Sequence, residues 1–236
     1  MCGARRRHAV YLWAAVTVWA AAPADAQALS PYRAVKARAV LRDKLPCLGC
    51  HALDGEGGRI GPDLSRLPGT LSTAFLYSMI RDPQGTRPGS LMPRTPMSQA
   101  TLDLVVSYLG ARRAAGGAPA GATSVAAALR TAGAGGDRDA RTLYATFCAA
   151  CHGSRGRGDG FNAEYLPVAP AVHADPVAMS RRTDDRLFDA IAGGGAVVGR
   201  SPRMPAFGAT LSRAEIRSLV RYVRELCRCE GPAWSR

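Results

Sequence analysis

Histidine, lysine and aromatic residues are scarce in this sequence. Only 4 of the 236 residues are histidine, and phenylalanine, tryptophan and tyrosine together make up 6%. Functions that need many imidazole side chains are therefore excluded. Disorder over the whole chain is also excluded, because 47% of the residues are hydrophobic and can form a core. The 26 glycines and 16 prolines predict long loops and short helices.

Apolar runs long enough to cross a bilayer are also lacking. The longest, residues 9–22, has 14 residues, whereas a spanning helix needs about 20. It follows the basic run Arg5 to Arg7 and precedes Ala24-Asp25-Ala26, a small-x-small cleavage pattern. Residues 1–26 are therefore predicted to be a signal peptide cleaved before Gln27, with the mature protein in the periplasm. An uncleaved membrane anchor is the alternative.

A segment rich in glycine and alanine divides the rest of the chain. In residues 110–136, 18 of 27 positions are one or the other, which is typical of a linker. The sequences on either side repeat the same order of features: CxxCH, then Met-Pro, then an amphipathic helix. We therefore expect a first domain at 27–110, a linker at 111–136, a second domain at 137–230 and a tail at 231–236.

Hydrophobic spacing predicts helices in both halves. Leu102, Val105, Val106 and Leu109 recur with helical spacing, as do Ile216, Leu219, Val220 and Val223 in the second half. Ser212 and Glu215 form a predicted capping box before the second of these helices. A further helix is expected over residues 183–191, ended by glycines 193–195. No alternating strand pattern is present, so the predicted fold class is all-α.

Two CxxCH motifs are the most specific signal. They are Cys47-Leu48-Gly49-Cys50-His51 and Cys148-Ala149-Ala150-Cys151-His152. This pattern marks covalent attachment of a c-type haem. Residues i and i+3 lie on one face of a helical turn, so two thiols can meet the two vinyl groups of one porphyrin while the histidine faces the iron. Zinc bound by two CxxC pairs, or a redox dithiol, are the alternatives.

With these motifs the chain resembles di-haem c-type cytochromes built from two small cytochrome c domains. The first half adds residues 60–64 (IGPDL), Met92-Pro93 and Tyr108-Leu109. The second adds the glycine-rich loop 156–160, residues 204–207 (MPAF) and Tyr222-Val223, and is the closer match. The resemblance implies two tandem cytochrome c-like domains with two covalently attached haems. It also implies that carbonyls of Pro62 and, as a weaker counterpart, Pro170 hold the proximal imidazoles.

The sixth ligand of each iron is predicted by elimination. His51 and His152 take the proximal positions, and the remaining histidine of the mature chain, His173, is expected in a solvated loop between prolines. Methionine is then the natural ligand. Met204, which precedes a proline and the last helix, is predicted for the second haem. Met92 is predicted for the first, with Met97 as the alternative.

Iron saturated by histidine and methionine transfers electrons and binds no substrate. The predicted function is therefore a periplasmic electron carrier, or the electron-transfer subunit of a larger complex. A di-haem peroxidase or a sulfur-oxidising enzyme, each with an open iron position, is the alternative, and a binding subunit with structural haems is a third.

Removing residues 1–26 leaves a formal charge of +11, carried mostly by arginine. This charge suits an acidic redox partner, such as a dehydrogenase, a quinol-oxidising complex or a terminal oxidase. Peripheral membrane association is possible on the same ground, whereas solubility and pairing with haem propionates explain the arginines without a partner. No nucleic-acid motif is present. Cys227 and Cys229 are expected to be poorly placed to bridge each other.

Overall fold

The structure, a computed structural model, describes residues 29–115 and 138–235. The expected signal peptide and residues 116–136 of the expected linker lie outside these ranges. Helices predominate, in agreement with the predicted class. Among the described residues, no helix is long and apolar enough to cross a membrane.

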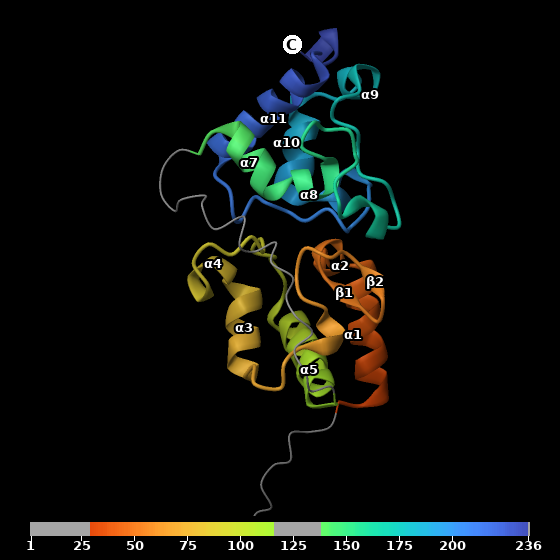
Figure 1. Cartoon of the computed structure of the whole chain (residues 1–236), viewed down its shortest axis with the longest axis vertical. Helices are drawn as coiled ribbons and strands as arrows, with labels where there is room; N and C mark the ends of the chain where they lie inside the picture. The colour runs from red at the N-terminus through yellow and green to blue at the C-terminus, as the bar shows by residue number, and fades with distance from the viewer. Residues whose placement is uncertain (1–28, 116–137, 236) are drawn as a thin grey trace, which may run out of the picture.

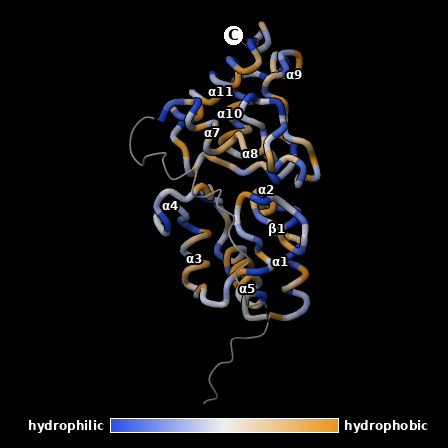
Figure 2. Tube along the Cα trace, in the orientation of Figure 1, coloured by the Kyte–Doolittle hydropathy of each residue, from blue (hydrophilic) through white to orange (hydrophobic). Residues whose placement is uncertain are grey.

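Within residues 29–115, the first half has five helices, a short hairpin and one turn of 3-10 helix. They are, in order, α1 (Pro31–Asp43), α2 (Cys47–Cys50), β1 (Ala52–Leu53), β2 (Glu56–Gly57), η1 (Leu64–Arg66), α3 (Thr73–Arg81), α4 (Pro83–Thr86) and α5 (Gln99–Ala115). The four residues predicted to face the core from α5 are all buried, which confirms that helix. Figure 2 shows the hydrophobic stretch along α5.

The elements of the second half are α7 (Ala140–Phe147), α8 (Ala149–His152), η2 (Ala163–Tyr165), α9 (Pro176–Ser180), α10 (Asp184–Gly193), η3 (Gly195–Val198), α11 (Arg213–Cys227) and η4 (Ala233–Ser235). The last α-helix, α11, packs against three of the other helices, α7, α9 and α10. The predicted capping box of Ser212 and Glu215 is present at the start of α11. α10 begins after Thr183, whose side chain accepts a hydrogen bond from Arg186 N. It ends at Gly193, and the next residue, Gly194, has a φ of 81°.

Each half buries its own hydrophobic cluster. The first cluster includes Leu41, Leu48 and Val105, and the second includes Leu143, Met179 and Leu219. The two halves are stacked along the long axis of the molecule (Figure 1), with α2 of the first half beside the end of the second half that carries α8. Hydrogen bonds join them there, from Arg94 N to Thr210 Oγ1 at 2.9 Å and from Asn162 Nδ2 to Gly49 O at 2.8 Å.

A two-strand hairpin pairs Ala52–Leu53 with Glu56–Gly57, although the sequence shows no strand pattern. Asp54 and Gly55 form its turn, with φ values of 53° and 86°. Asp-Gly is a favoured pair for such a turn. Strands of two residues are too short to show alternation, so this dipeptide was the only signal for them.

Cys227 and Cys229 form a disulfide, so the expectation that they are poorly placed to bridge was wrong. α11 ends at Cys227, and the intervening Arg228 adopts a left-handed conformation with φ 50° and ψ 43°. This reversal brings the two Cα atoms to 5.1 Å, a separation that a disulfide spans.

Candidate functional site

The second CxxCH motif forms the short helix α8 directly after α7. The Cys148 N–H bonds to Tyr144 O, which ends α7, and the His152 N–H bonds to Cys148 O, which holds the motif in one turn. The His152 Nδ1 lies 2.9 Å from the carbonyl oxygen of Ala171. The resemblance implied the carbonyl group of Pro170 as the partner of this nitrogen. The structure shows that the partner is the carbonyl group of the next residue, Ala171. With Nδ1 held by a carbonyl, Nε2 is the nitrogen left for a metal.

His173 is packed inside the second half and is not the solvated loop residue that the sequence suggested. Its ring stacks on His152 with centroids 4.1 Å apart and an angle of 12° between the planes. Its Nδ1 lies 2.9 Å from the hydroxyl oxygen of Tyr144. Burial lowers the pKa of His173 well below its ordinary value, with a contribution from His152. The prolines on either side of His173 predicted a loop, but they could not indicate that this loop folds back over α7 and α8.

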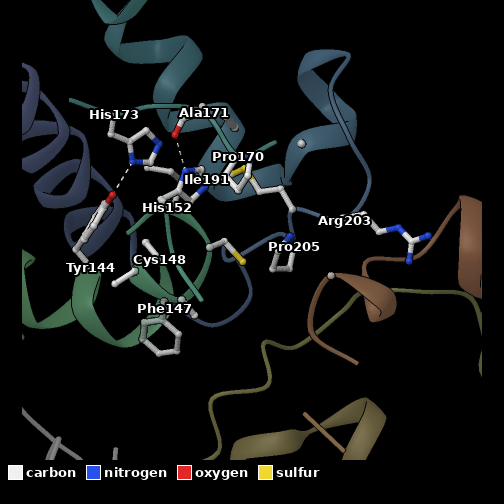
Figure 3. A pocket seen from close by; sticks show the side chains of 18 of the residues that line it. Tyr144, Phe147, Cys148, His152, Pro170, Ala171, His173, Ile191, Arg203 and Pro205 are labelled. Atoms are coloured by element: carbon white, nitrogen blue, oxygen red, sulfur yellow. Dashed lines mark hydrogen bonds between the residues drawn. The ribbon is translucent and has the colours of Figure 1, made fainter. Parts of the chain in front are cut away.

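A cavity of about 720 Å³ lies beside this motif. Cys148, Cys151, His152 and Met204 all line it, so the structure brings together the four residues predicted to hold the second haem. Figure 3 shows His152 hydrogen-bonded to Ala171 and the Tyr144 hydroxyl pointing at His173, with Cys148 and Phe147 nearby. A volume of this size is typical of sites that take a cofactor.

The first motif has the same local geometry. The His51 Nδ1 lies 2.8 Å from the Pro62 carbonyl oxygen, which confirms the predicted partner. Gly61 packs against this ring: a Cβ there would lie 2.3 Å from His51 Cε1, so a larger residue would displace the imidazole. Burial lowers the pKa of both His51 and His152, which favours the neutral imidazole that binds metals.

Met92 and Met97 lie in the segment between α4 and α5. The Met92 carbonyl accepts a hydrogen bond of 2.6 Å from Gln84 Nε2. Its neighbours Leu91 and Pro93 line the 720 Å³ cavity together with Cys50. Met97 instead packs against the hydrophobic cluster of the first half. Met92 therefore stays the predicted ligand of the first haem, with Met97 as the alternative.

The pKa values of the motif cysteines are raised, not lowered. Burial raises the pKa of Cys47 to about 11 and that of Cys148 to about 12. Burial also raises the pKa of Cys50 to about 12, and Cys151 adds to the rise. A redox dithiol needs a lowered thiol pKa, so these sites do not support that alternative. Among the described residues, no three His, Cys, Asp or Glu side chains are grouped to hold a metal ion, as a zinc site would require.

The residues present fit a covalently bound haem. Each motif offers two thiols on one turn and an imidazole oriented through Nδ1. In addition, Arg203 Nη1 is buried without a hydrogen-bond partner, beside Met204 on the cavity wall. An arginine donor without a partner suits a carboxylate, such as a haem propionate. Figure 3 shows the Arg203 side chain directed toward the ribbon of the first half.

Comparison with known proteins supports this assignment for the second half. Residues 136–223 match the family model for the cbb3-type cytochrome c oxidase subunit III. This half is therefore similar to a c-type cytochrome domain. Such a domain binds haem iron covalently and transfers electrons.

One curated protein is also similar to part of this chain. It is again an oxidase subunit, and the match is shorter. It is cytochrome c oxidase subunit 2 of Alkalihalophilus pseudofirmus, which is 35% identical over 72 residues. The match covers 27% of this chain and 21% of that protein. No solved structure matches the chain significantly.

Reasoning from the sequence missed two residues at this site, Ala171 and Asn162. Ala171 is adjacent to Pro170, which the resemblance indicated, so only geometry could select it. Asn162 is completely buried, and it is the single asparagine of the chain. A lone amide shortly after a CxxCH motif was the one available signal.

Proposed function

We propose that the chain is a di-haem cytochrome c that transfers electrons between redox partners. Residues 27–110 and 137–230 would form two tandem cytochrome c domains, joined by the linker 111–136. The observation that carries the proposal is that His51 and His152 share one hydrogen-bonding arrangement. Each imidazole has its Nδ1 close to a backbone carbonyl oxygen, at 2.8 and 2.9 Å, and each histidine directly follows a pair of partly buried cysteines.

Haem supplies the one-electron chemistry, and the residues of this chain hold and tune it. Cys47 and Cys50 would attach the first haem, and Cys148 and Cys151 the second. His51 and His152 would be the proximal ligands, with Met92 and Met204 on the opposite sides. Pro93 and Pro205 follow these methionines and stiffen the loops, which reduces the entropy lost in forming a weak iron–sulfur bond.

The partner best supported is a terminal oxidase complex, with this chain as its electron donor or as a subunit. Both comparisons point to oxidase subunits, although the curated match spans about a fifth of that relative. A dehydrogenase or a quinol-oxidising complex with an acidic surface would supply the electrons. We place these reactions in the periplasm, because c-type attachment suits an exported chain with the predicted signal peptide.

Mass spectrometry of the denatured, exported protein tests this proposal. The expected mass is that of residues 27–236 plus two haems, since covalent attachment survives unfolding. Replacing Cys148 and Cys151 by alanine should remove one haem and leave the other. A gain of one haem or none in the wild-type protein would contradict the di-haem assignment.

Ligand binding separates the carrier from an enzyme. Carbon monoxide or cyanide must first displace a methionine, so binding should be slow and peroxide turnover negligible. Rapid carbon monoxide binding to one reduced haem, with substantial turnover of peroxide, would favour the enzyme alternative.

A further inference from the structure

The contact between the two halves is built around the Asn162 side chain. Asn162 belongs to the second half and is 0% exposed. Its Nδ2 donates to Gly49 O at 2.8 Å and to Cys151 Sγ at 3.2 Å, while its Oδ1 accepts from Arg59 N at 2.6 Å. One amide thus bonds to both CxxCH motifs, which lie about a hundred residues apart in the chain.

The backbone of Asn162 is also tied to the second motif. Its N–H bonds to Ala150 O at 2.9 Å. The main chain at Asn162 is therefore fixed to residues 148–152, and it orients both polar atoms of the side chain, Nδ2 and Oδ1. A fully satisfied buried amide has one orientation, because any rotation would leave a polar group without a partner.

Glycines make this close approach possible. A Cβ on Gly49 would lie 1.9 Å from Arg203 O, and a Cβ on Gly58 would lie 2.4 Å from Gly49 O and 2.7 Å from Asn162 Oδ1. The first motif is therefore held between Asn162 on one side and the residue preceding Met204 on the other. Cys50 and Cys151, one cysteine from each motif, line the same cavity.

We propose that Asn162 is a positioning residue that joins the two haem-attachment segments, so that electrons pass directly between the two haems of one chain. This inference rests on the proposed di-haem function. The exchange moves one electron: one ferrous iron is oxidised as the other, ferric, iron is reduced, and no proton or further reactant takes part. The amide also donates to the Cys151 sulfur, so it tunes the second haem through its attachment.

Asn162→Asp is the variant that tests the Nδ2 donor most specifically. It keeps the shape of the side chain and the acceptor for Arg59 N, and it removes the Nδ2 donor to Gly49 O and to Cys151 Sγ. Asn162→Ala is the second variant, in case a buried carboxylate prevents folding. Thr210→Val is the matched control, because it deletes a hydrogen bond between the halves that does not involve Asn162, the one from Arg94 N, without touching either motif.

Three measurements are made on the full-length di-haem protein. They are the reduction potential of each haem, the magnetic coupling between the two ferric irons, and the rate at which the haems equilibrate after a short pulse of reductant. For both Asn162 variants we expect weaker coupling, one shifted potential and a fall in the rate on the order of tenfold, since small displacements of reacting groups have large kinetic effects. Thr210→Val should match the wild type.

The inference is overturned if both Asn162 variants retain the wild-type rate and potentials. It is equally overturned if Thr210→Val slows the exchange as much, because the interface as a whole would then be responsible. Lower thermal stability with unchanged potentials and rate would indicate a purely structural amide, which also contradicts it. Failure of the proposed function is recognised separately, since the wild-type protein would then carry fewer than two haems.

Discussion

At the scale of single residues, the two methionines of the second half lie in different environments and can be compared directly. Met204 lines the cavity beside His152, whereas Met179 is completely buried in the hydrophobic cluster. Met204→Ala should therefore abolish the long-wavelength sulfur-to-iron charge-transfer band of one haem and lower its reduction potential, because methionine ligation raises that potential. Absorption spectroscopy of the ferric protein and a redox titration measure both effects.

Met179→Leu is the control for this experiment. It replaces one apolar side chain by another of similar volume, which costs under about 1.5 kcal/mol in a typical core. Both haem spectra should remain unchanged. If Met204→Ala leaves the band and the potential as they were, another residue is the sixth ligand.

At the scale of helices, the start of α11 combines a capping box with an ion pair. The Ser212 N–H donates to Glu215 Oε2 at 2.8 Å, and Arg138 Nη2 lies 2.9 Å from Glu215 Oε1. Burial alone would raise the pKa of Glu215, but the hydrogen bonds from Ser212 and Arg138 outweigh it and the pKa is lowered. This helix packs against α7, which leads into the second CxxCH motif.

We expect Glu215→Gln to destabilise the second half by about 1 kcal/mol at neutral pH, the size of a typical capping interaction. Because the folded protein lowers the pKa of this carboxylate, its stabilisation is complete above the pKa of the unfolded chain. It disappears as the pH falls through the lower, folded value, so the difference between variant and wild type should shrink in acid.

Urea denaturation at several pH values measures this difference. Glu225→Gln, an exposed glutamate on the same helix, is the matched control and should have little effect. A difference between Glu215→Gln and wild type that does not change with pH would contradict the electrostatic explanation.

At the scale of the whole molecule, basic residues outnumber acidic ones, with 31 lysines and arginines against 18 aspartates and glutamates. Arg155 and Arg157 are exposed in the glycine-rich loop that follows the second motif. Electron exchange with an acidic partner should slow as salt rises, because charges are screened beyond about 8 Å at physiological ionic strength. Changing both arginines to glutamate should slow the exchange at low salt and leave the haem spectra unchanged, which stopped-flow spectroscopy can measure.

The double variant Arg33→Glu, Lys36→Glu makes the same change in net charge on α1 and serves as the control. A larger effect at the glycine-rich loop than on α1 would identify that loop as the docking face. Equal effects would mean that the total charge acts, and an exchange rate independent of salt would remove the steering role of the arginines.

Local chemistry explains why so much of the site could be predicted from the sequence. The candidate attachment residues follow from a five-residue motif, since one helical turn brings residues i and i+3 to the same face. The helices α5, α10 and α11 follow from hydrophobic spacing, and the cap of α11 follows from Ser212 and Glu215. All of these depend on residues a few positions apart, so the sequence alone determines them.

Tertiary structure determined the contacts between segments that lie far apart in the sequence. The carbonyl beside His152 belongs to Ala171, and the ring of His173 stacks on His152, because the loop folds back over α8. The Cys227–Cys229 disulfide depends on the left-handed conformation of one residue. Asn162 reaches Gly49 because the two halves pack closely enough to bury an amide between their motifs. Pairing across such sequence distances depends on complementary shape and on satisfied hydrogen bonds, and no local pattern encodes either.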